Sequence, residues 1–223
     1  ISRGESIEDT AKVMGRYLHG LVIRTYGQEI VDEFAQHAGI PVVNALTDFL
    51  HPCQIYSDVM TLAEKWGNDG SDLQALKGRK LVFMGDCASN MANSWVLAGA
   101  LFGMEIVLSG PDGFAPGTEI ANELSKIAPG QKPVFVEDPE AAIRGADAVY
   151  TDVWVSMGDE EEASKRLTAM APYSVTNSLM EKAGPKSLFL HCMPAHPGEE
   201  VTQEVLSSDR AVLFDQAENR LHM

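Results

Sequence analysis

The chain has 223 residues, of which 45% are hydrophobic and 22% are charged, a composition typical of a globular protein that excludes a disordered one. Its formal net charge of −15 at pH 7 repels phosphate backbones and anionic lipids, so we expect neither nucleic acid nor membrane partners. An anionic substrate would need arginines near its binding site to overcome the repulsion from this net negative charge.

The three cysteines, Cys53, Cys87 and Cys192, follow no disulfide or CxxC pattern, which favours a reducing compartment. No apolar run approaches the ~20 residues that span a bilayer. The start at Ile1 shows no signal peptide, and a helical pattern follows at once. We therefore interpret the sequence as one that begins inside a longer protein, and we expect a cytoplasmic location.

The first 66 residues alternate amphipathic stretches with short apolar runs. Helical spacing of apolar residues predicts helices over 6–18 and 28–38, and apolar runs predict buried strands over 21–24 and 41–44. A longer helix is predicted over 52–66, with proline in its first turn, where a missing N–H is harmless.

A polar, glycine-bearing stretch over 67–78 is the best candidate for a linker. The pattern after it predicts strands over 80–84, 105–108, 133–136, 147–152, 188–191 and 212–214, and helices over 91–102, 118–127, 138–144 and 160–170. This rhythm is typical of an α/β fold with a doubly wound parallel sheet over 67–223. We expect residues 1–50 to be the C-terminal part of a second α/β domain and 51–66 to be an interdomain helix. Ligands of such folds bind at the carboxyl ends of the strands.

Two polar clusters lie at predicted helix starts. In His51-Pro52-Cys53-Gln54, the free N–H groups of the helix suit an oxyanion or a polarised carbonyl, which His51 and Gln54 can both reach, although a capping histidine fits equally well. The loop 85–90 occupies the place of a dinucleotide loop but lacks the G-x-G-x-x-G spacing. Its Asn90 suits either a carboxylate ligand or a helix cap.

Two further clusters follow strands. Asp152, with Ser156-Met157-Gly158 shortly after, is placed to accept an ammonium group, and the alternative is an Asx-type turn before a capped helix. In the run 190–197, Cys192 is either a small core residue or a ligand-contacting thiol beside a histidine. The spacing of His191, Cys192 and His196 matches no usual zinc site, so we expect no metal.

Together these clusters resemble the ornithine carbamoyltransferases, within the aspartate/ornithine carbamoyltransferase superfamily, and the resemblance covers essentially the whole chain. The pattern His-Pro-x-Gln at 51–54 marks the superfamily. The combination of Asp-x-x-x-Ser-Met-Gly at 152–158 with His-Cys-x-Pro at 191–194 is more specific and indicates ornithine.

The resemblance implies attack by the δ-amine of ornithine on carbamoyl phosphate, which yields citrulline and phosphate without a cofactor or metal. It implies that Arg24, His51 and Gln54 hold the carbamoyl oxygen and that Arg220 points into the same region. Asp152 and Ser156 would bind the ornithine α-amino group, and Asp152 with Cys192 would bring ornithine into its reactive protonation state. The remaining implied contacts are Asn90 with the ornithine α-carboxylate, Met157 in the ornithine pocket, and Cys192 with the Met193 backbone at the carbamoyl amide.

One departure concerns the phosphate loop. The family's Ser-x-Arg-Thr motif, at a helix start in the first domain, does not occur in these 223 residues, and we find no counterpart of the helix that ends the family's chains. A helix N-terminus with arginines is what a phosphate needs. We therefore expect these residues alone to turn over little or no substrate.

Other interpretations remain open at this stage. In a sister enzyme that uses putrescine, Asn90 would have no carboxylate to bind and Asp152 no α-ammonium group. In one that uses N-acylornithine, Asp152 would have no α-ammonium group to bind. A non-catalytic amino-acid-binding module is the main alternative of another class, and a nucleotide-binding domain lacks its glycine fingerprint. The resemblance also implies a role in arginine metabolism and a homo-oligomer, a trimer or a multiple of trimers.

Overall fold

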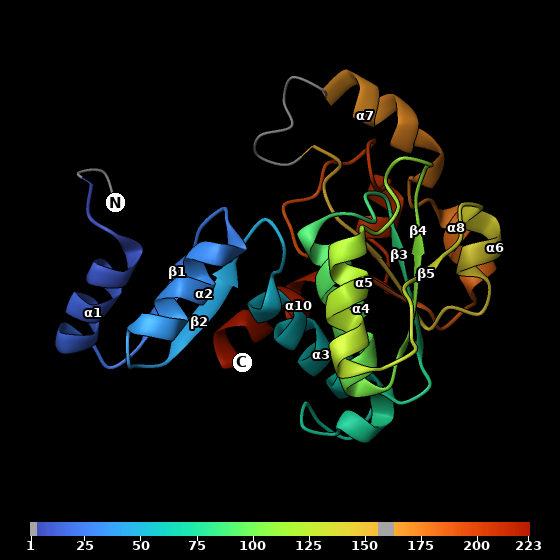
Figure 1. The fold of residues 1–223 in the computed structure, drawn as a ribbon. Coiled ribbons are helices and arrows are strands. Elements are labelled where there is room, and N and C mark those ends of the chain that lie inside the picture. The colour runs from blue at the N-terminus through green and yellow to red at the C-terminus, as the bar shows by residue number, and fades with distance from the viewer. Residues whose placement is uncertain (1–3, 156–162) are drawn as a thin grey trace.

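The computed structural model describes residues 4–155 and 163–223, which form two unequal α/β parts. Figure 1 shows the N-terminal elements set apart from a larger body, with helices α3 and α10 between them. Every helix in the described part of the chain is too short or too polar to span a bilayer.

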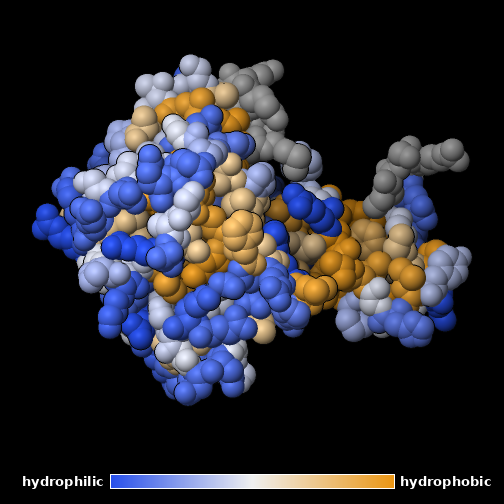
Figure 2. All heavy atoms as spheres, turned by 180° about the vertical axis from the view of Figure 1, so that it is seen from behind, coloured by the Kyte–Doolittle hydropathy of each residue, from blue (hydrophilic) through white to orange (hydrophobic). Residues whose placement is uncertain are grey.

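The smaller part is a pair of parallel strands with two helices. Strands β1 (Leu21–Arg24) and β2 (Val42–Leu46) pair with each other, and helices α1 (Ile7–Tyr17) and α2 (Gln28–His37) pack together beside them. Its core is small because only Ala11, Phe34 and Ala38 form the buried cluster. Large apolar side chains remain exposed here, among them those of Val22 and Tyr26. Figure 2 shows this hydrophobic surface, which extends toward the larger part.

The larger part is built on a five-stranded parallel sheet in the order β5-β4-β3-β6-β7. Its strands are β3 (Lys80–Met84), β4 (Glu105–Ser109), β5 (Val134–Phe135), β6 (Ala148–Thr151) and β7 (Leu188–His191). Successive residues of a strand face opposite sides of the sheet. Leu81 and Phe83 therefore enter one buried cluster, whereas Val82 and Met84 enter the other. The sheet is covered on both faces, which confirms the predicted doubly wound fold.

Helices cover the two faces of the sheet. One face carries α3 (Pro52–Trp66), α4 (Asn90–Phe102) and α5 (Thr118–Ile127). The other carries α6 (Pro139–Ile143), α8 (Asn177–Ala183) and α9 (Gln203–Leu206). The remaining elements are α7 (Ala163–Met170), α10 (Leu213–His222), which packs on α3, and two short 3₁₀ turns, η1 (Leu73–Leu76) and η3 (Ala171–Tyr173).

One expected strand was wrong. The apolar run 212–214 is not a strand, because α10 begins at Leu213 and buries that side chain in the core. The stretch 67–78, the candidate linker, contains η1 and the fully buried Leu76. Short apolar runs do not distinguish a strand from the start of a buried helix.

Candidate functional site

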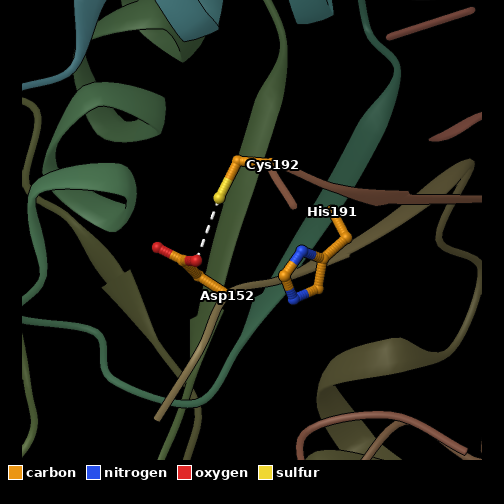
Figure 3. A group of neighbouring side chains, drawn as sticks. All are labelled: Asp152, His191 and Cys192. Atoms are coloured by element: carbon orange, nitrogen blue, oxygen red, sulfur yellow. Dashed lines mark hydrogen bonds between the residues drawn. The ribbon is translucent and has the colours of Figure 1, made fainter. Parts of the chain in front are cut away.

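The first feature of the site is a contact between the ends of two neighbouring strands. Thr151 of β6 lies opposite His191 of β7, so the residues that follow, Asp152 and Cys192, leave the sheet side by side. The Cys192 Sγ donates to Asp152 Oδ1 over 2.9 Å (Figure 3). Burial, and next the neighbouring Asp152 carboxylate, raise the pKa of Cys192 well above its ordinary value. Cys192 is therefore a thiol that donates a hydrogen bond, not a thiolate nucleophile.

The His191 ring takes no part in this contact (Figure 3). Its Nδ1 accepts the Met193 N–H over 2.8 Å, and its Nε2 lies 3.2 Å from Glu200 Oε1. Possible ligand atoms of Asp152, His191 and Cys192 do lie within 4.8 Å of one another. Both ring nitrogens already have protein partners, however, so these residues do not fit a zinc ion as they stand.

The second feature is His51 at the start of α3. Its backbone N–H donates to Ser94 Oγ of α4 over 2.8 Å, which ties the two helices together. Burial, and next the charge of Arg24 at the end of β1, lower the pKa of His51 to about 4, and the charge of Arg220 acts in the same direction. Within the described part of the chain, the buried His51 Nδ1 has no hydrogen-bond partner. His51 is thus a neutral imidazole at neutral pH.

Gln54 lies one turn further along α3, almost fully buried. Its Nε2 donates to Asp58 Oδ1 over 2.7 Å, and its Oε1 lies 3.4 Å from Arg220 Nη1. The same Nη1 is 3.4 Å from the carbonyl oxygen of Cys192. Arg220, on α10, therefore connects the His51–Gln54 cluster with the Cys192–Asp152 contact.

A buried polar network lies beneath these side chains, and sequence analysis missed it. Asp58 Oδ1 also accepts from Gln216 Nε2 over 2.7 Å, and Gln216 Oε1 accepts the His191 N–H over 3.1 Å. The Gln216 amide further donates to the Tyr150 hydroxyl over 3.1 Å. Burial raises the pKa of Asp58 to about 7. The signal in the sequence was a carboxylate on the apolar face of a long helix.

Asn90 joins the two parts of the molecule. Its Nδ2 donates to the Thr47 carbonyl over 2.8 Å, and the cap of α4 is Ser89, not Asn90. The preceding loop turns at Gly85, with φ +116°, where an added Cβ would lie 3.1 Å from Trp154 Nε1. Only glycine lets this loop lie so close.

The structure thus brings Arg220, Gln54, Cys192 and Asp152 into one chain of contacts, with His51 and Arg24 coupled to it by charge and Met193 by its backbone. Asn90 lies on the same edge, at the contact between the two parts. The expected Ser156 and Met157 lie outside the described residues.

Two family models match the chain. Residues 77–223 match the aspartate/ornithine carbamoyltransferase Asp/Orn binding domain, and residues 1–64 match the carbamoyl-P binding domain of the same family. Residues 65–76, which run from the end of α3 through η1, lie between the two matched segments.

Relatives of known sequence and structure cover the whole chain. The ornithine carbamoyltransferases of Methanoculleus marisnigri and Desulfotalea psychrophila are 46% and 47% identical to it, over 100% of this chain and 69% and 71% of their own lengths. The solved ornithine carbamoyltransferase of Pyrococcus furiosus is 41% identical, with a TM-score of 0.88 over 99% of this chain and 69% of that one. That of Gloeobacter violaceus is also 41% identical, with a TM-score of 0.84 over 98% of this chain and 71% of that one. These similarities, together with the strand-end geometry, show that the chain belongs to the ornithine carbamoyltransferase family.

Proposed function

We propose that the protein transfers the carbamoyl group of carbamoyl phosphate to the δ-amine of L-ornithine and releases citrulline and phosphate. The δ-nitrogen forms a bond to the carbamoyl carbon, and the bond from that carbon to the phosphate oxygen breaks with its electron pair. The proton lost by nitrogen leaves with phosphate. One observation carries this proposal: Arg220 joins Gln54, on the carbamoyl phosphate side, to the Cys192–Asp152 contact.

The carbamoyl carbonyl oxygen needs hydrogen-bond donors, because negative charge develops there during attack. Arg24 and Arg220 supply permanent positive charge, and both act on His51 electrostatically, which supports a common region. The neutral His51 imidazole keeps one N–H, so it can donate to the oxygen. This local charge offsets the acidity of the molecule as a whole.

The carbamoyl amide needs acceptors instead. The Gln54 Nε2 is bound to Asp58, so its Oε1 is the end of the side chain that faces Arg220. That Oε1 and the Cys192 carbonyl oxygen both lie 3.4 Å from Arg220 Nη1. The two acceptors therefore point toward the same place, where the N–H groups of a carbamoyl amide could bind. We therefore assign Gln54 to the carbamoyl amide rather than to the carbamoyl oxygen, beside the backbone of Cys192 and Met193.

On the ornithine side, the Asp152 carboxylate suits the α-ammonium group, and Asn90 suits the α-carboxylate. We keep Ser156 and Met157 as further candidates for this pocket. Cys192 lies between the two groups of residues, where its thiol hydrogen bond holds Asp152 in place. Together, Asp152 and Cys192 would favour the uncharged δ-amine for attack.

The test is citrulline formation by the complete protein that contains these residues. Asp152→Asn should raise the KM for ornithine about 30-fold or more, because leaving a buried charge unpaired costs about 2 kcal/mol or more. Cys192→Ala should lower kcat. Asp147→Asn is the matched control, because Asp147 lies just before β6, at the opposite end from the site, and pairs with Arg79. Wild-type protein that binds ornithine but forms no citrulline would indicate a non-catalytic module, and faster turnover of putrescine or N-acylornithine would indicate a sister enzyme.

We further propose that the protein acts in arginine biosynthesis, in the cytoplasm, as a trimer or a multiple of trimers. We also propose domain limits of 1–50 and 67–223, with 51–66 as the helix between them. Light scattering on the purified complete protein tests the trimer directly, and a monomeric mass would contradict it.

A further inference from the structure

The loop after β7 is held by two buried ionisable side chains that have no role in the proposed reaction. Both Glu200 and His191 have side chains that are 0% exposed. The Glu200 Oε1 accepts the His196 backbone N–H over 2.6 Å and lies 3.2 Å from His191 Nε2. Burying a carboxylate is costly unless hydrogen bonds compensate for the lost water. The buried pair of Glu200 and His191 therefore points to a role other than filling the core.

The contacts of His191 determine where its ring hydrogen lies. Its Nδ1 accepts the Met193 N–H over 2.8 Å, and a nitrogen that accepts a hydrogen bond carries no hydrogen of its own. The hydrogen of the neutral ring is therefore on Nε2, from which it is donated to Glu200. Glu200 thereby selects the tautomer that can accept from Met193.

The Met193 N–H belongs to the same planar peptide group as the Cys192 carbonyl. In a trans peptide, the N–H and the C=O point in opposite directions. The bond from the Met193 N–H to His191 therefore directs the Cys192 oxygen the other way, to 3.4 Å from Arg220 Nη1. Met193 has φ 59°, which is unfavourable for a residue with a side chain, so this peptide needs an external hold.

We propose that His191, oriented by Glu200, is a positioning residue that fixes the peptide between Cys192 and Met193, so that the Cys192 carbonyl faces the carbamoyl amide. This inference rests on the proposed function. It assigns His191 no contact with substrate and no part in proton transfer.

Two isosteric variants of the complete protein separate the two ring nitrogens. His191→Asn keeps an acceptor at the Nδ1 position but loses the donor to Glu200, whereas His191→Gln keeps that donor and loses the acceptor for Met193. We expect kcat/KM for carbamoyl phosphate to fall on the order of 10- to 100-fold in His191→Gln but to stay within about threefold of wild type in His191→Asn. The Tm should change in the reverse order, because His191→Asn leaves a buried carboxylate short of a donor.

A purely structural role predicts that kcat/KM follows Tm across the two variants, and that result would overturn the proposal. A measurement on the wild-type protein needs no variant: ¹⁵N NMR of the His191 ring should show hydrogen on Nε2 and a bare Nδ1, and hydrogen on Nδ1 would overturn it too. If the wild-type protein forms no citrulline, the proposed function fails. The NMR measurement of the ring tautomer then still tests whether His191 Nδ1 accepts the Met193 N–H.

Discussion

At the scale of single residues, the buried carboxyl of Asp58 makes stability depend on pH. Burial raises its pKa from the ordinary 3.8 to about 7, so the folded state binds the proton more tightly than the unfolded state. The stability contributed by this proton is complete below about pH 4 and is lost as the pH rises to about 7.

Asp58→Asn removes this titration while keeping an acceptor for the amides of Gln54 and Gln216. We expect the unfolding free energy of the variant, relative to wild type, to improve by up to about 1.4 kcal/mol per pH unit between roughly pH 5 and 7. Urea unfolding at several pH values measures it. Ser57→Ala, one residue earlier on α3, removes the hydrogen bond to the Gln216 carbonyl and should give a difference that does not change with pH. A constant difference for Asp58→Asn would refute the expectation.

Sequence analysis could place Cys192 and Asp152 on one edge, because the ends of parallel strands meet there. It could not find Asp58 with Gln216, since these residues are 158 positions apart and no local pattern links them. It also could not tell that Gln54 faces the site with its oxygen, because that orientation depends on Asp58.

At the scale of elements, the contact between α3 and α10 positions Arg220. The neighbouring Asn219 donates from Nδ2 to Thr61 Oγ1 over 2.9 Å and to Glu64 Oε2 over 2.8 Å, and it is 4% exposed. These bonds fix the rotation of α10 about its own axis. The direction of the Arg220 side chain follows from that rotation.

Asn219→Ala should lower the unfolding free energy by about 1–3 kcal/mol, because it removes the hydrogen bonds of a buried amide to the buried Thr61 hydroxyl and to Glu64. It should also raise the KM for carbamoyl phosphate, since α10 no longer holds Arg220 in place. Thermal unfolding and steady-state kinetics measure the two effects. Glu218→Gln, an exposed change on the same helix, should alter stability by no more than about 0.5 kcal/mol. An unchanged KM in folded Asn219→Ala protein would show that α10 does not position Arg220.

The strands of the larger sheet followed from the sequence because each is a short apolar run between turn signals. The helix α10 did not, because its first residues, Leu213 and Phe214, continue an apolar run that resembles a strand. The short helices α8 and α9 were also not predicted, since each has only one or two turns of periodic pattern.

At the scale of the whole molecule, the two parts differ in how much core they bury. The buried cluster of the smaller part has three residues, whereas each face of the larger sheet has a cluster of its own. Local stability follows the apolar contacts that must be broken for a segment to open.

Backbone amides of β1 and β2 should therefore exchange with deuterium faster than those of β3 and β6. Hydrogen–deuterium exchange measured by mass spectrometry on these 223 residues tests this directly. The exposed loop residues 129–132 serve as an internal reference for fast exchange. Equal protection of the two sheets would contradict the expectation.

The contact between Gln54 and Arg220 has a consequence for biosynthesis. These residues are 166 positions apart, and the Cys192 carbonyl that shares the arginine is 28 positions before it. A growing chain can therefore fold its first strands on the ribosome long before it can bind carbamoyl phosphate. Nascent chains arrested before α10 has emerged should have no ligand to stabilise them, so the cell would have to protect them by other means.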